Sequence, residues 1–196
     1  MLMKYSRFLP CLVLICSNLY GQTAKDTVGT YPVIKSYVWG NVFAVPERTF
    51  KPDPTLKYKI VIDLTVGPKN EKDTAGFKEV NWGFGEVGRK LNLHVADGIP
   101  EKNIDIVVAV HGFAIFSMLN NEAYKKKYGV DNPSLTVIDE LKKAGVKLIA
   151  CGQAMHFMKV SPAELITGSA IGLTAQTVLT AHQAMGYSLQ MIRPED

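Results

Sequence analysis

Cysteine is scarce in this sequence, and beyond the N-terminal 21 residues only Cys151 remains. The chain has three cysteines among 196 residues, and the other two, Cys11 and Cys16, lie close to the N-terminus. One thiol cannot supply the repeated cysteine spacings of structural zinc sites. An odd cysteine indicates either pairing between molecules or a free reactive thiol, and a small buried apolar side chain is the alternative.

Charge of either sign is in little excess. The chain has 22 Lys and Arg against 18 Asp and Glu, a formal net charge of +4. The one basic run, Lys125–Lys127, is typical of a solvated helix face. These features exclude the electrostatic pattern of a nucleic-acid-binding domain, so we expect no nucleic-acid partner. We also find no internal repeat and, after the N-terminal segment, no apolar run long enough for a membrane span.

The N-terminus has the pattern of a secretory signal. Lys4 and Arg7 precede the short apolar run 8–16, which is followed by small and polar residues. We therefore expect residues 1–21 to be a signal peptide, cleaved after Gly21, and the mature protein to be periplasmic or secreted. A lipid anchor on Cys16 is the alternative, but the bulky Ile15 stands where a small residue is expected.

The mature chain divides into an arm and one domain. Residues 22–57 contain many Pro, Thr and Lys and too few apolar residues for a core of their own, so we interpret them as an N-terminal arm. Short stretches at 31–34 and 41–45 could form edge pieces that pack over the domain. The remaining residues, 58–196, have the size of a single α/β domain.

Within that domain, strand and helix patterns alternate. Apolar, β-branched runs predict strands, and apolar residues at three- and four-residue spacing, such as the stripe from Phe77 to Val95, predict helices. The strands are expected at 59–64, 104–110, 146–151, 169–172 and 187–192. Such alternation predicts a three-layer α/β fold, with a mostly parallel sheet of about five strands between helices.

One glycine pattern is misleading. Gly83, Gly85 and Gly88 match the spacing of a dinucleotide-binding turn. That turn must directly follow a strand, whereas these glycines lie well beyond the strand and inside a helical stripe. We expect them to allow the close approach of another element, and we expect no cofactor.

Cys151 lies where a predicted strand ends and a helix begins, with Gly152 permitting the turn. Sites in parallel α/β sheets form at the carboxyl ends of strands, and backbone N–H groups there favour a thiolate. His111 ends another predicted strand, so it could lie at the same edge and act as a base or a charge partner. Its alternative role is a structural hydrogen bond. Cys151, His111 and His156 have no recognised metal-ligand spacing, so we expect no metal site.

Three stretches of the sequence resemble the DsrE/DsrF-like proteins: 107–112, 128–133 and 141–153. The resemblance extends from about residue 58 to residue 192, and its most specific part surrounds Cys151. It implies a DsrEFH-like (YchN-like) fold and assembly as homotrimers or homohexamers. Cytoplasmic relatives pass sulfur between proteins as a cysteine persulfide, and Cys151 matches their reactive cysteine by position.

The resemblance leads to the hypothesis of an exported sulfur carrier, a sulfurtransferase-type protein that uses Cys151 with His111 beside it. Ligand contacts are expected at the same edge from Gly112, Asn132, Gly152 and Gln153, although a helix cap is the alternative role for Asn132. Because no second cysteine could resolve a persulfide, the donor or acceptor would be another protein or a small thiol. The same absence argues against a thiol- or peroxide-reducing enzyme. A non-catalytic, homo-oligomeric binding or scaffold protein with a structural Cys151 stays open.

Overall fold

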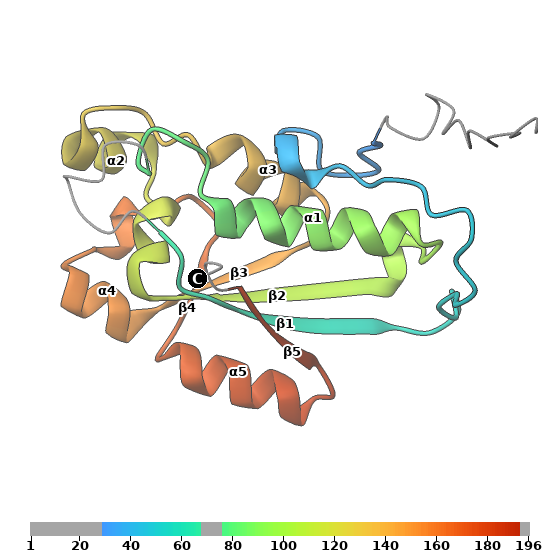
Figure 1. Ribbon diagram of the computed structural model, residues 1–196. Coiled ribbons are helices and arrows are strands. Elements are labelled where there is room, and N and C mark those ends of the chain that lie inside the picture. The colour runs from blue at the N-terminus through green and yellow to red at the C-terminus, as the bar shows by residue number, and fades with distance from the viewer. Residues whose placement is uncertain (1–28, 68–75, 193–196) are drawn as a thin grey trace, which may run out of the picture.

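The computed structural model describes residues 29–67 and 76–192, and its centre is a five-stranded sheet (Figure 1). All neighbouring strands are parallel, in the order β4-β3-β2-β1-β5. The strands are β1 (Tyr58–Leu64), β2 (Ile104–Val110), β3 (Lys147–Cys151), β4 (Ala170–Gly172) and β5 (Ser188–Ile192). The helices are α1 (Trp82–Ala96), α2 (Asn121–Tyr128), α3 (Leu135–Lys143), α4 (Gly152–Met158) and α5 (Ala175–Ala184). The predicted α/β class, the strand count and the parallel sheet are confirmed.

The two faces of the sheet are covered differently. Alternate residues of the central strands, such as Ile62 and Val108, pack with α1 and α3 in the large core. The intervening residues face α5, which Figure 1 shows below the sheet, opposite α1 and α3. There Ala109 and Cys151 pack against Val178 of α5 in a smaller cluster. The strands are thus buried on both faces, which accounts for their almost continuous apolar sequences.

The predicted helices differ from the structure mainly at their starts. The apolar stripe was extended to Phe77, but α1 begins at Trp82, because the Asn81 side chain caps it by accepting the Gly83 N–H at 2.7 Å. After β2 the chain forms a 3₁₀ helix, η4 (Gly112–Met118), and then α2. Ser134 and not Asn132 occupies the N-cap position of α3, although the Asn132 side chain accepts the Ser134 N–H.

The glycines of α1 contact the N-terminal arm. A Cβ atom on Gly85 would lie 2.4 Å from the Tyr37 ring, and one on Gly88 would lie 2.9 Å from Ile34. The prediction of a close approach is therefore confirmed. The described part of the arm packs Ile34 into the main core, and its two short pieces pair only through an antiparallel bridge between Thr30 and Val42. The predicted signal peptide, 1–21, lies outside the described residues.

Candidate functional site

Cys151 is the last residue of β3 and the N-cap residue of α4. Its Sγ accepts a hydrogen bond from the Ala154 N–H at 3.4 Å, so the sulfur already faces a backbone donor. The thiol is free, and the residue is only 4% exposed. The sulfur thus lies at the carboxyl edge of the sheet with one backbone N–H and an otherwise mainly apolar set of neighbours around it.

The cover over Cys151 is thin. The buried residues that pack with it are Ala109 of β2 and Ala175 and Val178 of α5, with the partly buried Leu179 beside them. These side chains are small, and Ala175 begins the first turn of α5. Leu173, two residues before Ala175, is 73% exposed. The start of α5 is thus part of the cover over the sulfur.

Gly152 and Gln153 hold the chain next to this cover. A Cβ atom on Gly152 would lie 3.0 Å from the Gly172 carbonyl oxygen, so a larger residue would crowd the end of β4. The Gln153 N–H donates to the Leu173 carbonyl at 3.2 Å, and its side chain is exposed. Both residues lie beside Cys151, and their contacts join α4 to the β4–α5 link.

His111 continues β2 in extended conformation at the same edge of the sheet. Its N–H donates to the Leu64 carbonyl at 2.9 Å, and its Nε2 lies 2.5 Å from Oδ1 of Asp63 on β1. The two side chains are 29% and 24% exposed. Gly112 follows with φ +54°, a backbone conformation suited to glycine, and turns the chain into η4. His111 thus has a charged partner that the sequence analysis did not identify.

The sequence around Asp63 indicates that its carboxylate has a partner. It is the only charged residue in the run Ile60–Leu64, which is otherwise apolar. A carboxylate in a strand that is otherwise buried needs a partner, because burying an unpaired charge is costly. The partner could not be identified from the sequence, because that requires knowing that β1 and β2 are neighbours.

Asn132 lies elsewhere, in a buried network of polar side chains. Its Nδ2 donates to the carbonyls of Ser117 and Leu119 at 2.9 and 2.6 Å, and its Oδ1 accepts the Ser134 N–H at 3.0 Å. Asn81 joins the network by donating to Ser117 Oγ and by accepting from Gly83. The amide of Asn132 is thus engaged within the protein, and its contacts hold η4 in place.

Histidine does not add a metal site here. His156 is exposed on α4 and stacks edge-on against Phe157, with ring centroids 5.8 Å apart. Within residues 29–67 and 76–192, no three His, Cys, Asp or Glu side chains gather as a ligand set. In the same part of the chain, no helix is long and apolar enough to cross a bilayer.

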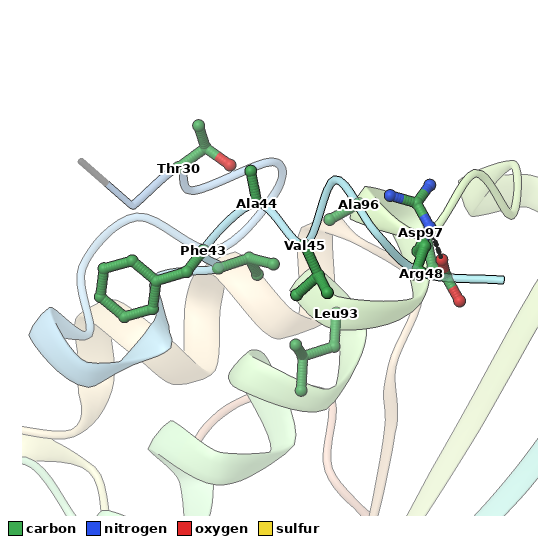
Figure 2. Close-up of a pocket in the computed structure, with 9 residues that line it drawn as sticks. Thr30, Phe43, Ala44, Val45, Arg48, Leu93, Ala96 and Asp97 are labelled. Carbon is green, nitrogen blue, oxygen red and sulfur yellow. Dashed lines mark ion pairs between the residues drawn. The ribbon is translucent and has the colours of Figure 1, made fainter. Parts of the chain in front are cut away.

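An apolar groove lies at the other end of α1, between that helix and the arm (Figure 2). Its volume is about 420 Å³, and Arg48 and Asp97 form an ion pair of 3.1 Å at one side of it. Val45 and Leu93, which line it, are both exposed. Because α1 runs from the carboxyl edge of the sheet towards the amino edge, this groove is separate from Cys151 (Figure 1).

A second polar cluster occupies the amino edge of the sheet, on the face that α5 covers. Tyr187 donates to Asp105 Oδ2 at 2.6 Å, and Lys147 lies 3.1 Å from Oδ1 of the same carboxylate. The hydrogen bond to Asp105 raises the pKa of Tyr187 to about 12. These groups satisfy one another, so the cluster ties β5 to the central strands.

Together these observations define an all-parallel α/β protein with one cysteine at the carboxyl end of a central strand. The sequence model of the DsrE/DsrF-like family matches residues 83–189, more than half of the chain. The chain therefore belongs to the DsrE/DsrF-like family, as its sequence motifs predicted.

Two solved structures are similar to this chain. The protein of unknown function MTH1491 from Methanobacterium thermoautotrophicum has 15% identity and a TM-score of 0.48, over 69% of this chain and all of its own. The ychN protein of E. coli has 18% identity and a TM-score of 0.47, over 69% of this chain and 99% of its own. No protein of curated function matches.

Proposed function

We propose that this protein is an exported sulfur carrier that holds sulfane sulfur as a persulfide on Cys151. Membership of the DsrE/DsrF-like family supports a relation to sulfur relay. The observation that carries the proposal is the position of Cys151, at the carboxyl end of β3 with the Ala154 N–H directed at its sulfur. Export rests on the N-terminal sequence pattern of residues 1–21.

The chemistry requires only the exchange of one sulfur atom. The Cys151 thiolate attacks the outer sulfur of a donor persulfide, R–S–SH. A bond forms between Sγ and that sulfur as the donor S–S bond breaks, and the donor leaves as its thiolate. Transfer to an acceptor thiol is the same exchange in reverse, so no external oxidant or reductant is needed. Because the chain beyond residue 21 has no other cysteine, the acceptor is a second molecule.

Exchange also requires access to a sulfur atom that is 4% exposed. Local opening of an element with few buried contacts costs less than global unfolding. The first turn of α5 fits that description, since Ala175 and Val178 are its buried contacts with Cys151. We therefore propose that small persulfides reach Cys151 when this turn opens.

The second candidate function is a non-catalytic homo-oligomeric protein in which Cys151 is part of the core. The burial of the thiol in an apolar cluster favours it. Exposed apolar side chains that could contact another copy also favour it. They lie on α4, β4 and the link to α5, and are Phe157, Ile171 and Leu173. Assembly as a homotrimer or homohexamer is compatible with either candidate and stays a proposal.

Thiol labelling separates the two candidates. A sulfur carrier should react with a small alkylating reagent in the folded state, and Val178→Ala should raise the rate by roughly threefold or more by thinning the cover. Native and urea-unfolded protein would be compared by mass spectrometry, with Val95→Ala, which trims a partly buried valine of α1 at the main core and away from Cys151, as the matched control. If Cys151 were labelled only when the whole protein unfolds, in both variants, the cysteine would be structural.

A further inference from the structure

Three side chains from neighbouring strands lie on one face of the sheet near its carboxyl edge. Asp63 alternates along β1 with Ile62 and Leu64, which pack in the main core, so it faces the α5 side. Ala109, its register partner on β2, and Cys151 both pack on that side. His111 lies two residues after Ala109 and therefore on the same face.

The strand register brings His111 and Cys151 to the same level. Val110 of β2 pairs with Ala150 of β3, and the next residue on each strand is His111 and Cys151. Parallel neighbours lie roughly 4.8 Å apart in a sheet. The order across the edge is thus carboxylate, imidazole and thiol, on β1, β2 and β3 in turn.

The Asp63 contact determines which nitrogen of His111 carries the proton. An ionised carboxylate only accepts hydrogen bonds, so Nε2, at 2.5 Å from Oδ1, must donate. A neutral His111 then has its lone pair on Nδ1. Among the residues that the structure describes, none hydrogen-bonds to that nitrogen.

Asp63 also has no competing cation in the described part of the chain. The ordered segments around it, η4 and β5, contain no charged residue, and the only titratable residue of α5 is His182 in its last turn. Within residues 29–67 and 76–192, the contact with His111 is the one that joins Asp63 to a basic side chain. A carboxylate with one such partner is suited to orienting an imidazole.

We infer that Asp63 is a positioning residue that holds His111 so that Nδ1 shuttles the proton during sulfur transfer at Cys151. The inference rests on the proposed function and adds a third residue to the site. His111, which would touch the reacting atoms, is the catalytic base and acid. Asp63 acts through His111, much as a buried carboxylate orients the histidine of a nucleophile–histidine–carboxylate triad.

The proton balance of the transfer step is complete. The acceptor thiol R–SH gives its proton to Nδ1, and the resulting thiolate attacks the outer sulfur of the Cys151 persulfide. The S–S bond of R–S–SH forms as the S–S bond of the Cys151 persulfide breaks, and the electron pair of the broken bond stays on Sγ. The imidazolium then returns the proton to Sγ, so nothing is oxidised or reduced overall.

The test compares Asp63→Asn with wild type, using glutathione persulfide as donor and glutathione as acceptor. We expect the same sulfur load on Cys151 but a transfer rate about 10- to 100-fold lower, as when a carboxylate that orients a histidine is lost. Asp105→Asn is the matched control, because Asp105 lies on the same face at the opposite edge, and its transfer rate should be unchanged. Thermal unfolding checks that each variant is folded.

Two further readouts separate positioning from a structural role. Adding Asp63→Asn to His111→Gln should lower the transfer rate no further, because the two side chains act as a unit. Nitrogen-15 NMR of wild-type His111 should show the proton on Nε2, which needs no variant to fold. A normal transfer rate in Asp63→Asn, or a proton on Nδ1, would overturn this inference alone. Failure of wild-type Cys151 to load sulfur would overturn the proposed function as well.

Discussion

Replacing Asn92 with Leu is expected to lower the free energy of unfolding by about 3 kcal/mol, because it leaves several buried backbone groups without partners. Asn92 is fully buried in α1, and its amide makes four hydrogen bonds to the arm. Oδ1 accepts from the N–H groups of Val33 and Ile34 at 3.0 and 2.8 Å, and Nδ2 donates to the carbonyls of Ile34 and Gly40 at 2.8 and 2.9 Å. Urea unfolding measures the loss.

The same variant should release the arm while the sheet stays folded. Hydrogen exchange of the Val33 and Ile34 amides should accelerate in Asn92→Leu at temperatures well below its unfolding midpoint. Asn92→Asp is the comparison variant: it keeps the acceptor for both amides but sets a second acceptor oxygen against the Ile34 and Gly40 carbonyls, so it should also be destabilised. An unchanged free energy of unfolding in Asn92→Leu would contradict the role assigned to this amide.

Replacing Asn132 with Leu should also cost about 3 kcal/mol of stability, since three backbone groups lose their partner. These are the carbonyls of Ser117 and Leu119 and the N–H of Ser134. Because η4 begins at Gly112, directly after His111, its loosening should also reduce sulfur transfer, while the load on Cys151 is retained. Urea unfolding and the glutathione transfer assay measure the two effects.

Asn120→Ala provides the control for Asn132→Leu. Asn120 is the N-cap of α2, where its Oδ1 accepts the Ala123 N–H at 2.9 Å. Loss of such a cap costs about 1 kcal/mol. If Asn132→Leu cost no more than this control, or if it abolished sulfur loading outright, Asn132 would not have the loop-holding role that its contacts indicate.

The fold could be predicted from local pattern because each strand is buried on both faces. The runs that became β1, β2 and β3 are almost wholly apolar, and periodic segments separate them, so the parallel sheet followed from the sequence alone. The end of β3 also placed Cys151 at the correct edge. Gly83, Gly85 and Gly88 lie inside α1, as the helical stripe predicted, and not in a turn that directly follows a strand.

The features that could not be predicted from the sequence depend on contacts between distant segments of the chain. The pairing of Asp63 with His111 spans 48 residues and requires β1 and β2 to be neighbours, which periodicity does not determine. No local pattern distinguishes Asn92, because its partners lie in the arm 58 residues earlier in the chain. Asn132 was expected to contact a ligand at the carboxyl edge of the sheet, because polar loop residues can do so. Its side-chain amide instead makes hydrogen bonds to three backbone groups of the protein.

The central claim is most directly tested by the intact mass of the mature protein before and after exposure to glutathione persulfide, alongside Cys151→Ser. The account predicts a gain of one or more sulfur atoms in the wild type, reversed by a reductant and absent in the variant. No gain in folded wild-type protein would contradict it and would leave the structural cysteine of a binding or scaffold protein as the better account.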